Sequence, residues 1–109
     1  MAKELVRAQL VLLTPNQLAL LDPLDVELFV NISSLHEMRP EQIAHYIEQA
    51  DRHTRGFAYP KQWERWHNPE DDVVIARADY PIPQRWEQVH ERGHPIQRAF
   101  FHALYRVPG

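Results

Sequence analysis

The sequence predicts one α/β domain in which short strands alternate with helices and an antiparallel hairpin closes the C-terminal end. Apolar runs alternate with helical segments along residues 10–76, which is the pattern of parallel strands joined by helical crossovers. Residues 86–107 contain two further runs separated by Gly93 and Pro95, which favours an antiparallel pair. A chain of 109 residues that is 44% hydrophobic and 25% charged is large enough for one domain with a core. We therefore treat residues 1–109 as a single domain.

The N-terminal third is expected to begin with a strand followed by a short helix. Gln9–Leu13 is an apolar run whose length favours a buried strand. Thr14 is placed as an N-cap, Pro15 as the first helical residue and Gln17 as the residue that closes a capping box. These residues predict a helix that extends to about Leu21.

The middle of the chain is expected to contain a buried strand and a longer helix. Val26, Leu28, Phe29, Val30 and Ile32 predict a strand buried on both faces, with Glu27 as the exception. Pro40 opens a helix, and Gly56 is expected to end it. One face of this helix carries an apolar stripe with helical spacing at Ile43, Tyr46, Ile47 and Ala50.

The remaining elements are short. Phe57–Tyr59 and Val73–Ala76 are predicted strands, and Pro60–Asp72 between them is expected to be a polar loop. Trp86–Arg92 and Ala99–Val107 are expected to form the terminal antiparallel pair, with every second residue of the last strand on one buried face.

Composition argues against several classes of function. Twelve basic and fifteen acidic residues give a net charge of -3, which lacks the basic excess needed to bind a nucleic-acid backbone. The chain has no cysteine, so disulfides, iron–sulfur clusters and thiol catalysis are excluded. Only three glycines are present and none are clustered, so no glycine-rich phosphate loop is expected. No membrane span or signal peptide is readable, and the cytoplasm is the expected compartment.

Residues His90–His94 match the HExxH pattern of zinc-dependent hydrolases. That chemistry requires a helix, because only helical spacing brings the two histidines onto one face beside the glutamate. Gly93 lies inside the pattern and Pro95 follows it, and both oppose a helix. We expect a hairpin end that binds no metal, and a metal-dependent hydrolase remains the alternative.

A second group of polar residues follows the strand predicted at Val26–Ile32. It consists of Asn31, Ser33, Ser34, His36 and Glu37. Ligands of open parallel sheets bind beyond the carboxyl ends of the strands, so His36 is a candidate catalytic base and Glu37 either orients it or acts itself. The alternative is structural: Ser34 and Glu37 form a capping box and His36 is a solvated surface residue.

A third group combines aromatic rings with hydrogen-bond donors. It consists of Lys61, Trp63, Arg65, Trp66 and His67, in the predicted loop. Such a mixture suits a sugar-like acceptor. The alternative is that the two tryptophans cover the core beneath the loop.

Three sets of residues share one resemblance. They are the run Glu27–Met38, then Tyr59, Lys61, Gln62, Trp63, Asn68, Pro69, Asp72, Asp79, Tyr80, Pro81, Ile82, Pro83 and Trp86, and finally Glu91, Arg92, His94, Pro95, Ile96, Gln97, Phe100, Phe101, Ala103 and Leu104. In these residues the chain resembles the C-terminal half of the sugar O-methyltransferase family, and the likeness covers nearly the whole chain from about Leu10.

The resemblance implies half of a Rossmann-like fold, the seven-stranded sheet of class I S-adenosylmethionine-dependent methyltransferases. It implies His36 and Glu37 as acceptor-side catalytic residues, and a sugar or glycoside as the substrate. We expect Ser33, Ser34, Lys61, Trp63 and Trp66 to contact that substrate. No segment matches the cofactor-binding motifs, so the chain is expected to be inactive alone and to bind no S-adenosylmethionine. The alternative from another class is a non-catalytic α/β binding or assembly module.

Half a sheet leaves a strand edge without a neighbour. In the family the segment Val26–Ile32 lies beside the first strand, which this chain lacks. Either Gln9–Leu13 folds back beside it, or a second chain covers it. We expect a homodimer, and a complementary N-terminal half is the alternative partner.

Overall fold

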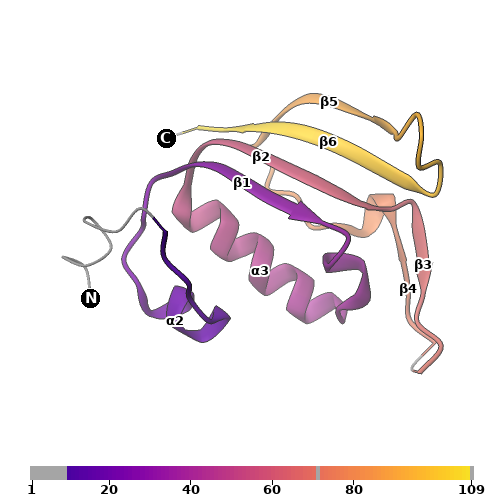
Figure 1. Cartoon of the computed structure of the whole chain (residues 1–109), viewed down its shortest axis with the longest axis horizontal. Helices are drawn as coiled ribbons and strands as arrows, with labels where there is room; N and C mark the ends of the chain where they lie inside the picture. Colours follow the sequence, from indigo (N-terminus) through magenta and orange to yellow (C-terminus); the bar gives the residue numbers. More distant parts are fainter. Residues whose placement is uncertain (1–9, 71, 109) are drawn as a thin grey trace.

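A computed structural model describes residues 10–70 and 72–108 and arranges them as a four-stranded sheet with helices on one face and a small hairpin at one end (Figure 1). The helices are α2 (Pro15–Leu20) and α3 (Pro40–His53), with short 3-10 turns η1 (Leu35–Glu37) and η2 (Arg77–Asp79). The strands are β1 (Val26–Ile32), β2 (Thr54–Trp63), β3 (Arg65–His67), β4 (Val74–Ala76), β5 (Glu87–Gly93) and β6 (Phe100–Val107).

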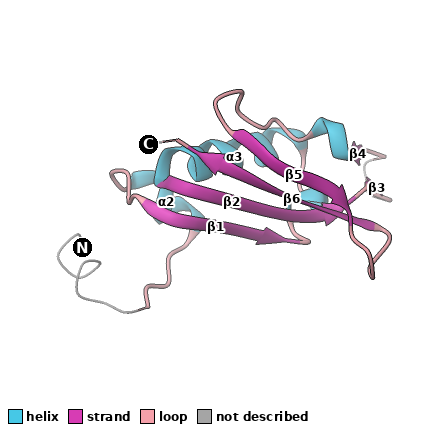
Figure 2. Cartoon of the chain, turned by 90° about the horizontal axis from the view of Figure 1, so that it is seen from above, coloured by secondary structure: helices cyan, strands magenta, loops and turns pink. Residues whose placement is uncertain are grey.

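The chain is an α/β domain, as predicted, and its main sheet is mixed, with β1 and β2 as the parallel pair. Its strand order is β1-β2-β6-β5, and β3 pairs with β4 in a separate two-stranded sheet. β1 and β2 are parallel and are connected through α3, whereas β6 runs antiparallel to both β2 and β5 (Figure 2). The predicted terminal hairpin is therefore confirmed, and β6 inserts between β2 and β5.

Both predicted helices are present. The Thr14 hydroxyl accepts a hydrogen bond from the Gln17 N–H, and the Gln17 side chain accepts one from the Thr14 N–H. This confirms the capping box that begins α2. In α3 the predicted stripe faces the sheet, with Ile43, Ile47 and Ala50 buried.

The end of α3 differs from the prediction. The helix ends at His53, and Thr54 enters β2 at once while its N–H still bonds the Ala50 carbonyl. Gly56 therefore lies inside β2, paired with Val107, and does not stop the helix. The glycine is needed there because β1 and β2 pack closely. In a sequence, a glycine required for close strand packing looks the same as a glycine that ends a helix.

The core lies between α3 and the inner face of the sheet. Phe101, Ala103, Tyr105 and Val107 alternate along β6 and are all buried, as predicted for the last strand. They meet Ala58 of β2 and the α3 stripe in one apolar cluster. Close packing here fixes the position of α3 beneath β2 and β6.

The outer face of the sheet is open. β1 was predicted to be buried on both faces, and this is wrong: Leu28 is 53% and Val30 is 49% exposed. Both helices lie on the inner side, and within the described residues no element packs over the outer side of β1 (Figure 1). Apolar content alone does not reveal whether a strand has one covered face or two.

The predicted first strand is absent. Leu10–Leu13 is irregular, with Leu10 and Leu12 exposed, and Gln9 lies outside the described residues. A strand needs a neighbour for its backbone hydrogen bonds, and this segment pairs with none of the described strands.

The predicted polar loop Pro60–Asp72 is also wrong. β2 continues to Trp63, and β3 pairs with β4 in the register Trp66 to Ile75. The strand predicted at Val73–Ala76 is present as β4 (Val74–Ala76) and forms one half of this hairpin. In the described part of the chain, no helix is long and apolar enough to cross a membrane.

Replacing Gly56 with alanine is predicted to destabilise the fold. Gly56 has a φ of 154°, and a Cβ there would lie 2.2 Å from the Glu27 carbonyl oxygen of β1. Relieving this overlap must separate β1 from β2, so we expect a loss of about 2 kcal/mol or more in the free energy of unfolding.

Chemical denaturation followed by circular dichroism measures this loss. Gly93→Ala is the matched control, because a Cβ there would meet its nearest atom, in the Glu64 carboxylate, at 3.6 Å. Equal unfolding midpoints for the two variants would contradict the prediction.

Candidate functional site

The candidate site is built where the parallel strands β1 and β2 end. Asn31 and Ile32 at the end of β1 lie opposite Pro60 and Lys61 of β2. The chain then turns sharply at Ser33, which has a φ of 58° and whose N–H donates to the Lys61 carbonyl at 2.7 Å. This turn directs the segment 34–37 across the end of β2.

Gln62 connects the segments that meet here, and it is fully buried. Its Nε2 donates to the Asn31 side-chain oxygen at 2.6 Å, and that oxygen also accepts from the Ser34 hydroxyl at 2.8 Å. Its Oε1 accepts from the Leu35 N–H and contacts His36 Nδ1, each at 3.2 Å. One amide therefore joins β1, β2 and η1.

These bonds determine the tautomer of His36. Gln62 Oε1 already serves as the acceptor for the Leu35 N–H, so His36 Nδ1 donates its proton to that oxygen. The other ring nitrogen, Nε2, then carries the lone pair. His36 is only 1% exposed, and Nε2 has no hydrogen-bond partner among the described residues.

Burial lowers the pKa of His36 from its usual value. The hydrogen bond that the ring donates to Gln62 and the negative charge of Glu37 oppose this shift, but desolvation of the charged ring is the larger effect. His36 is therefore neutral at pH 7 and has a basic nitrogen available. The alternative of a solvated surface histidine is wrong.

Glu37 lies beside the imidazole without a close hydrogen bond. Its Oε1 is 3.8 Å from His36 Nε2, and its side chain is 63% exposed. The alternative capping box is not formed either, because the Ser34 side chain makes no cap hydrogen bond and bonds Asn31 instead. Glu37 is thus placed to stabilise a protonated His36.

Aromatic rings enclose His36. Its ring centroid is 5.1 Å from that of Trp66 and 6.1 Å from that of Trp63, and the two indoles are 5.6 Å apart. Trp63 also packs on Phe100 at 5.2 Å. Both tryptophans are half-buried, and Trp66 Nε1 is a buried donor with no partner in the described chain.

The structure brings together some of the predicted residues and separates others. Lys61 lies at the edge of the aromatic group, where its ammonium is 5.3 Å from the centroid of Phe100 and bonds the Gln97 side chain. Arg65 is exposed, and His67 points to Asp72, with Nε2 and Oδ1 2.9 Å apart.

Sequence reasoning gave no role to Gln62. Period-two alternation places it on the same inward face as Ala58 and Pro60, and both are buried. A polar residue at an inward strand position indicates a buried hydrogen-bond partner. This position of Gln62 in the alternation is the sequence feature that could have identified it.

The HExxH pattern does not form a metalloprotease site. His90 lies within β5 and His94 just beyond it, so the helical spacing that zinc proteases need is absent. His102 of β6 lies between them, with ring centroids 5.2 Å from His90 and 5.4 Å from His94. Among the described residues, no group of three or more histidine, aspartate or glutamate side chains is placed to hold a metal ion.

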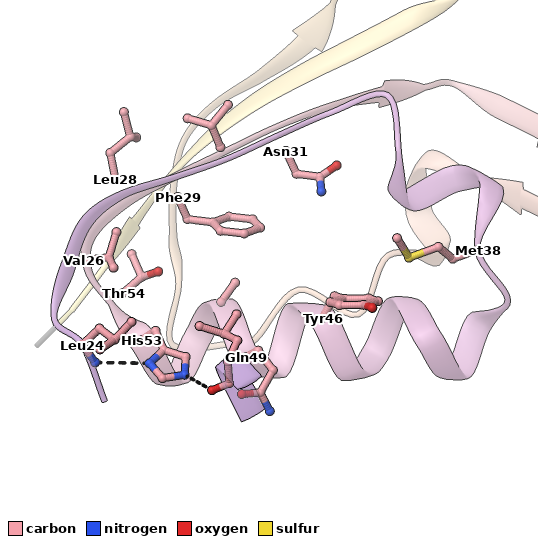
Figure 3. A pocket seen from close by; sticks show the side chains of 13 residues that line it. Leu24, Val26, Leu28, Phe29, Asn31, Met38, Tyr46, Gln49, His53 and Thr54 are labelled. Atoms are coloured by element: carbon pink, nitrogen blue, oxygen red, sulfur yellow. Dashed lines mark hydrogen bonds between the residues drawn. The ribbon is translucent and has the colours of Figure 1, made fainter. Parts of the chain in front are cut away.

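A separate apolar groove of about 360 Å³ lies between β1, α2 and α3. Figure 3 shows Phe29 and Asn31 pointing from β1 into it and Leu28 pointing to the opposite side of the strand. His53 closes one end, accepting from the Leu24 N–H at 3.2 Å and lying 3.0 Å from the Leu18 carbonyl.

Neither the two described glycines nor the two aspartates that precede β1 begin a loop from a strand to a helix. Gly56 lies inside β2 and Gly93 ends β5, so neither begins a loop between a strand and a helix. Asp22 and Asp25 precede β1 and do not follow a strand, where an acidic residue would bind a ribose. We therefore assign no cofactor-binding residue.

Comparison with family models, with curated proteins and with solved structures finds no match to this chain.

The burial of His36 predicts a pH-dependent loss of stability. Its folded pKa lies below the unfolded value of about 6.5, so the unfolded chain binds the proton first as the pH falls. The free energy of unfolding should therefore be unaffected by His36 above this pH and decrease below it.

Urea unfolding of the wild type and His36→Gln at about pH 7.5 and about pH 5 measures this contribution. The wild type should lose more stability on acidification than the variant. His102, whose pKa burial and neighbouring cationic groups also lower, contributes equally to both chains. An identical pH dependence for the two would contradict the prediction.

Proposed function

We propose that this chain is the acceptor-side half of an S-adenosylmethionine-dependent sugar O-methyltransferase. In this role His36 takes the proton from a sugar hydroxyl. The observation that carries the proposal is that His36 Nε2 and the indole N–H of Trp66 both lack a hydrogen-bond partner among the described residues, in rings whose centroids are 5.1 Å apart. A hydroxyl group is both donor and acceptor, so one sugar hydroxyl suits both atoms.

The surrounding residues suit a base. Gln62 holds Nδ1 as the donor and so keeps the lone pair on Nε2. When Nε2 accepts a proton, the ring becomes positively charged, and Glu37 at 3.8 Å stabilises that charge. Gln62 thus acts as a positioning residue through His36.

The aromatic group supports a carbohydrate acceptor. Trp63, Trp66 and Phe100 are half-buried and present flat apolar surfaces, against which the apolar face of a sugar ring packs. Lys61, Ser33 and Ser34 lie around this group or at the strand end and contribute polar atoms. Because His36 is 1% exposed, the hydroxyl reaches Nε2 when one of the flanking indoles moves.

The architecture also supports the half-enzyme proposal. A parallel pair, a terminal antiparallel hairpin and an unpaired edge on β1 are what the C-terminal half of this family would present. In the intact family enzyme S-adenosylmethionine supplies the methyl group. We propose that the cofactor-binding half is a separate segment that docks at β1.

A non-catalytic assembly module is the second candidate, and the open edge of β1 is the observation that favours it. Such a module would bind a protein partner and would have no use for the lone pair of His36. The two candidates therefore differ in whether simple glycosides perturb the His36 site.

Glycosides are predicted to bind weakly at the aromatic group. Titration with methyl glycosides of several hexoses and 6-deoxyhexoses, followed by NMR, should shift the indole N–H signal of Trp66 and the ring signals of His36. Trp86 is an internal control, because its indole N–H donates to Asp51 at 2.7 Å, far from the site in sequence and in the fold.

In His36→Gln, glycosides should still shift the Trp66 indole signal, but by a smaller amount. In Trp66→Leu, they should no longer shift the ring signals of His36. Shifts spread equally over Trp66 and Trp86, or no shift with any glycoside, would count against the carbohydrate proposal and favour the assembly module.

The chain alone is predicted not to bind S-adenosylmethionine detectably. If the missing contacts contribute about 5 kcal/mol of binding free energy, their loss raises a micromolar dissociation constant to the millimolar range. Titration calorimetry up to a few hundred micromolar cofactor should show no saturable heat. Saturable binding in the low micromolar range would mean that the chain builds its own cofactor site, contrary to the half-enzyme proposal.

A further inference from the structure

The outer edge of β1 lacks the features that usually protect an exposed strand edge. Its sequence from Val26 to Ile32 carries one charged residue, Glu27, and contains no lysine or proline. No described strand pairs with this edge, and Leu28, Val30 and Ile32 are exposed beside it. Natural proteins usually block such an edge with charge, proline or a covering segment.

We propose that β1 pairs antiparallel with β1 of a second copy of this chain, around a two-fold axis at Phe29. The two sheets then join into one continuous sheet. Antiparallel pairing of identical strands is isologous, so each residue has one fixed partner. With Phe29 facing itself, Leu28 faces Val30, Glu27 faces Asn31 and Val26 faces Ile32.

In this register, apolar residues face apolar residues on the outer side of the sheet. Leu28 and Val30 project from the same side of β1, where each is about half exposed. Pairing places apolar against apolar at both positions, and cross-strand pairs of this kind stabilise sheets. The exposed apolar surface of β1 is then shared between the two copies.

Glu27 and Asn31 are the polar residues of β1, and the pairing of β1 with β2 is irregular at Glu27, between Val26 and Leu28. Glu27 of one copy meets Asn31 of the other, so the charged residues of the two strands do not oppose each other. The Asn31 side-chain oxygen already accepts from Gln62 and Ser34, which leaves its amide N–H groups to donate to the carboxylate of the partner's Glu27.

Neighbouring registers are worse. A shift of two residues in one direction places Glu27 against Phe29, and a shift in the other places Asn31 against Phe29. Each shift also leaves two residues of the seven-residue strand unpaired at one end. An odd shift would set an outward residue against an inward one.

The contact between the two Phe29 side chains would lie next to the apolar groove beneath β1. Phe29 points into the groove of about 360 Å³, and the groove lies next to the unpaired edge (Figure 3). The partner's Phe29 would lie beside it at the mouth of this apolar space, where two rings pack favourably. A second copy thus covers the edge of β1 beside the groove.

This inference is independent of the proposed function, because it uses only β1 and the groove. A complementary N-terminal half would compete for the same edge. The self-pairing proposed here is the state of the chain in the absence of such a half.

Sedimentation at tens of micromolar tests the association. The wild type should be a dimer, and Leu28→Lys/Val30→Lys should be a monomer with an unchanged circular dichroism spectrum, because both positions are exposed in one chain. Val89→Lys is the matched control, since Val89 is an exposed apolar residue of β5, at the opposite edge of the sheet. It should leave the dimer intact.

Disulfide trapping tests the register, and the absence of native cysteine makes it direct. Leu28→Cys and Val30→Cys chains, oxidised separately, should form little cross-linked dimer. An equimolar mixture should cross-link readily, because these two positions face each other across the axis.

Several results would overturn the proposal. These are a wild-type monomer at tens of micromolar, a dimer that survives the double lysine substitution, and a dimer lost with Val89→Lys. Efficient cross-linking of either cysteine variant alone would show a different register. Glycoside titration of the monomeric lysine variant reports on the proposed function separately, since its site does not include β1 positions 28 and 30.

Discussion

The buried side-chain amide of Gln62 is the constraint on which the rest of the site depends. It bonds Asn31 on one side and both Leu35 and His36 on the other, so the ends of β1, β2 and η1 keep one relative position. A buried amide is stable only when its donors and acceptor are paired. The same bonds that hold the turn after β1 therefore determine which nitrogen of His36 carries the proton.

The environment of His36 balances two electrostatic effects. Burial among the tryptophans disfavours the charged ring, whereas the carboxylate of Glu37 favours it. Desolvation is the larger effect in the isolated chain, which keeps the imidazole neutral and its lone pair available. A nearby negative group eases the protonation of such a base, and the exposed Glu37 supplies one without a close hydrogen bond to the ring.

The sheet is covered on one side and open on the other. Both helices and the core lie on the inner face, while β1 leaves its outer side and its edge exposed. The exposed apolar side chains of β1 contribute little to the stability of the single chain, since apolar surface stabilises a fold only when it is removed from water. This asymmetry links the half-enzyme proposal to the proposed self-association, because both assign a neighbour to the same edge.

The sequence by itself determined the features that depend on neighbouring residues. The capping box of Thr14 and Gln17, the apolar stripe of α3 and the alternation along β6 arise from local hydrogen bonds and periodicity, and each was predicted. Only the tertiary structure decided the features that depend on distant segments. His36 is buried because β2 supplies Gln62 and Trp63 and β3 supplies Trp66. Gly56 is required because the Glu27 carbonyl oxygen of β1 lies 2.2 Å from where its Cβ would be, and Leu10–Leu13 is irregular because none of the described strands lies beside it. A pattern records which residues are apolar, but the partner that covers them is chosen by the packing of the whole chain.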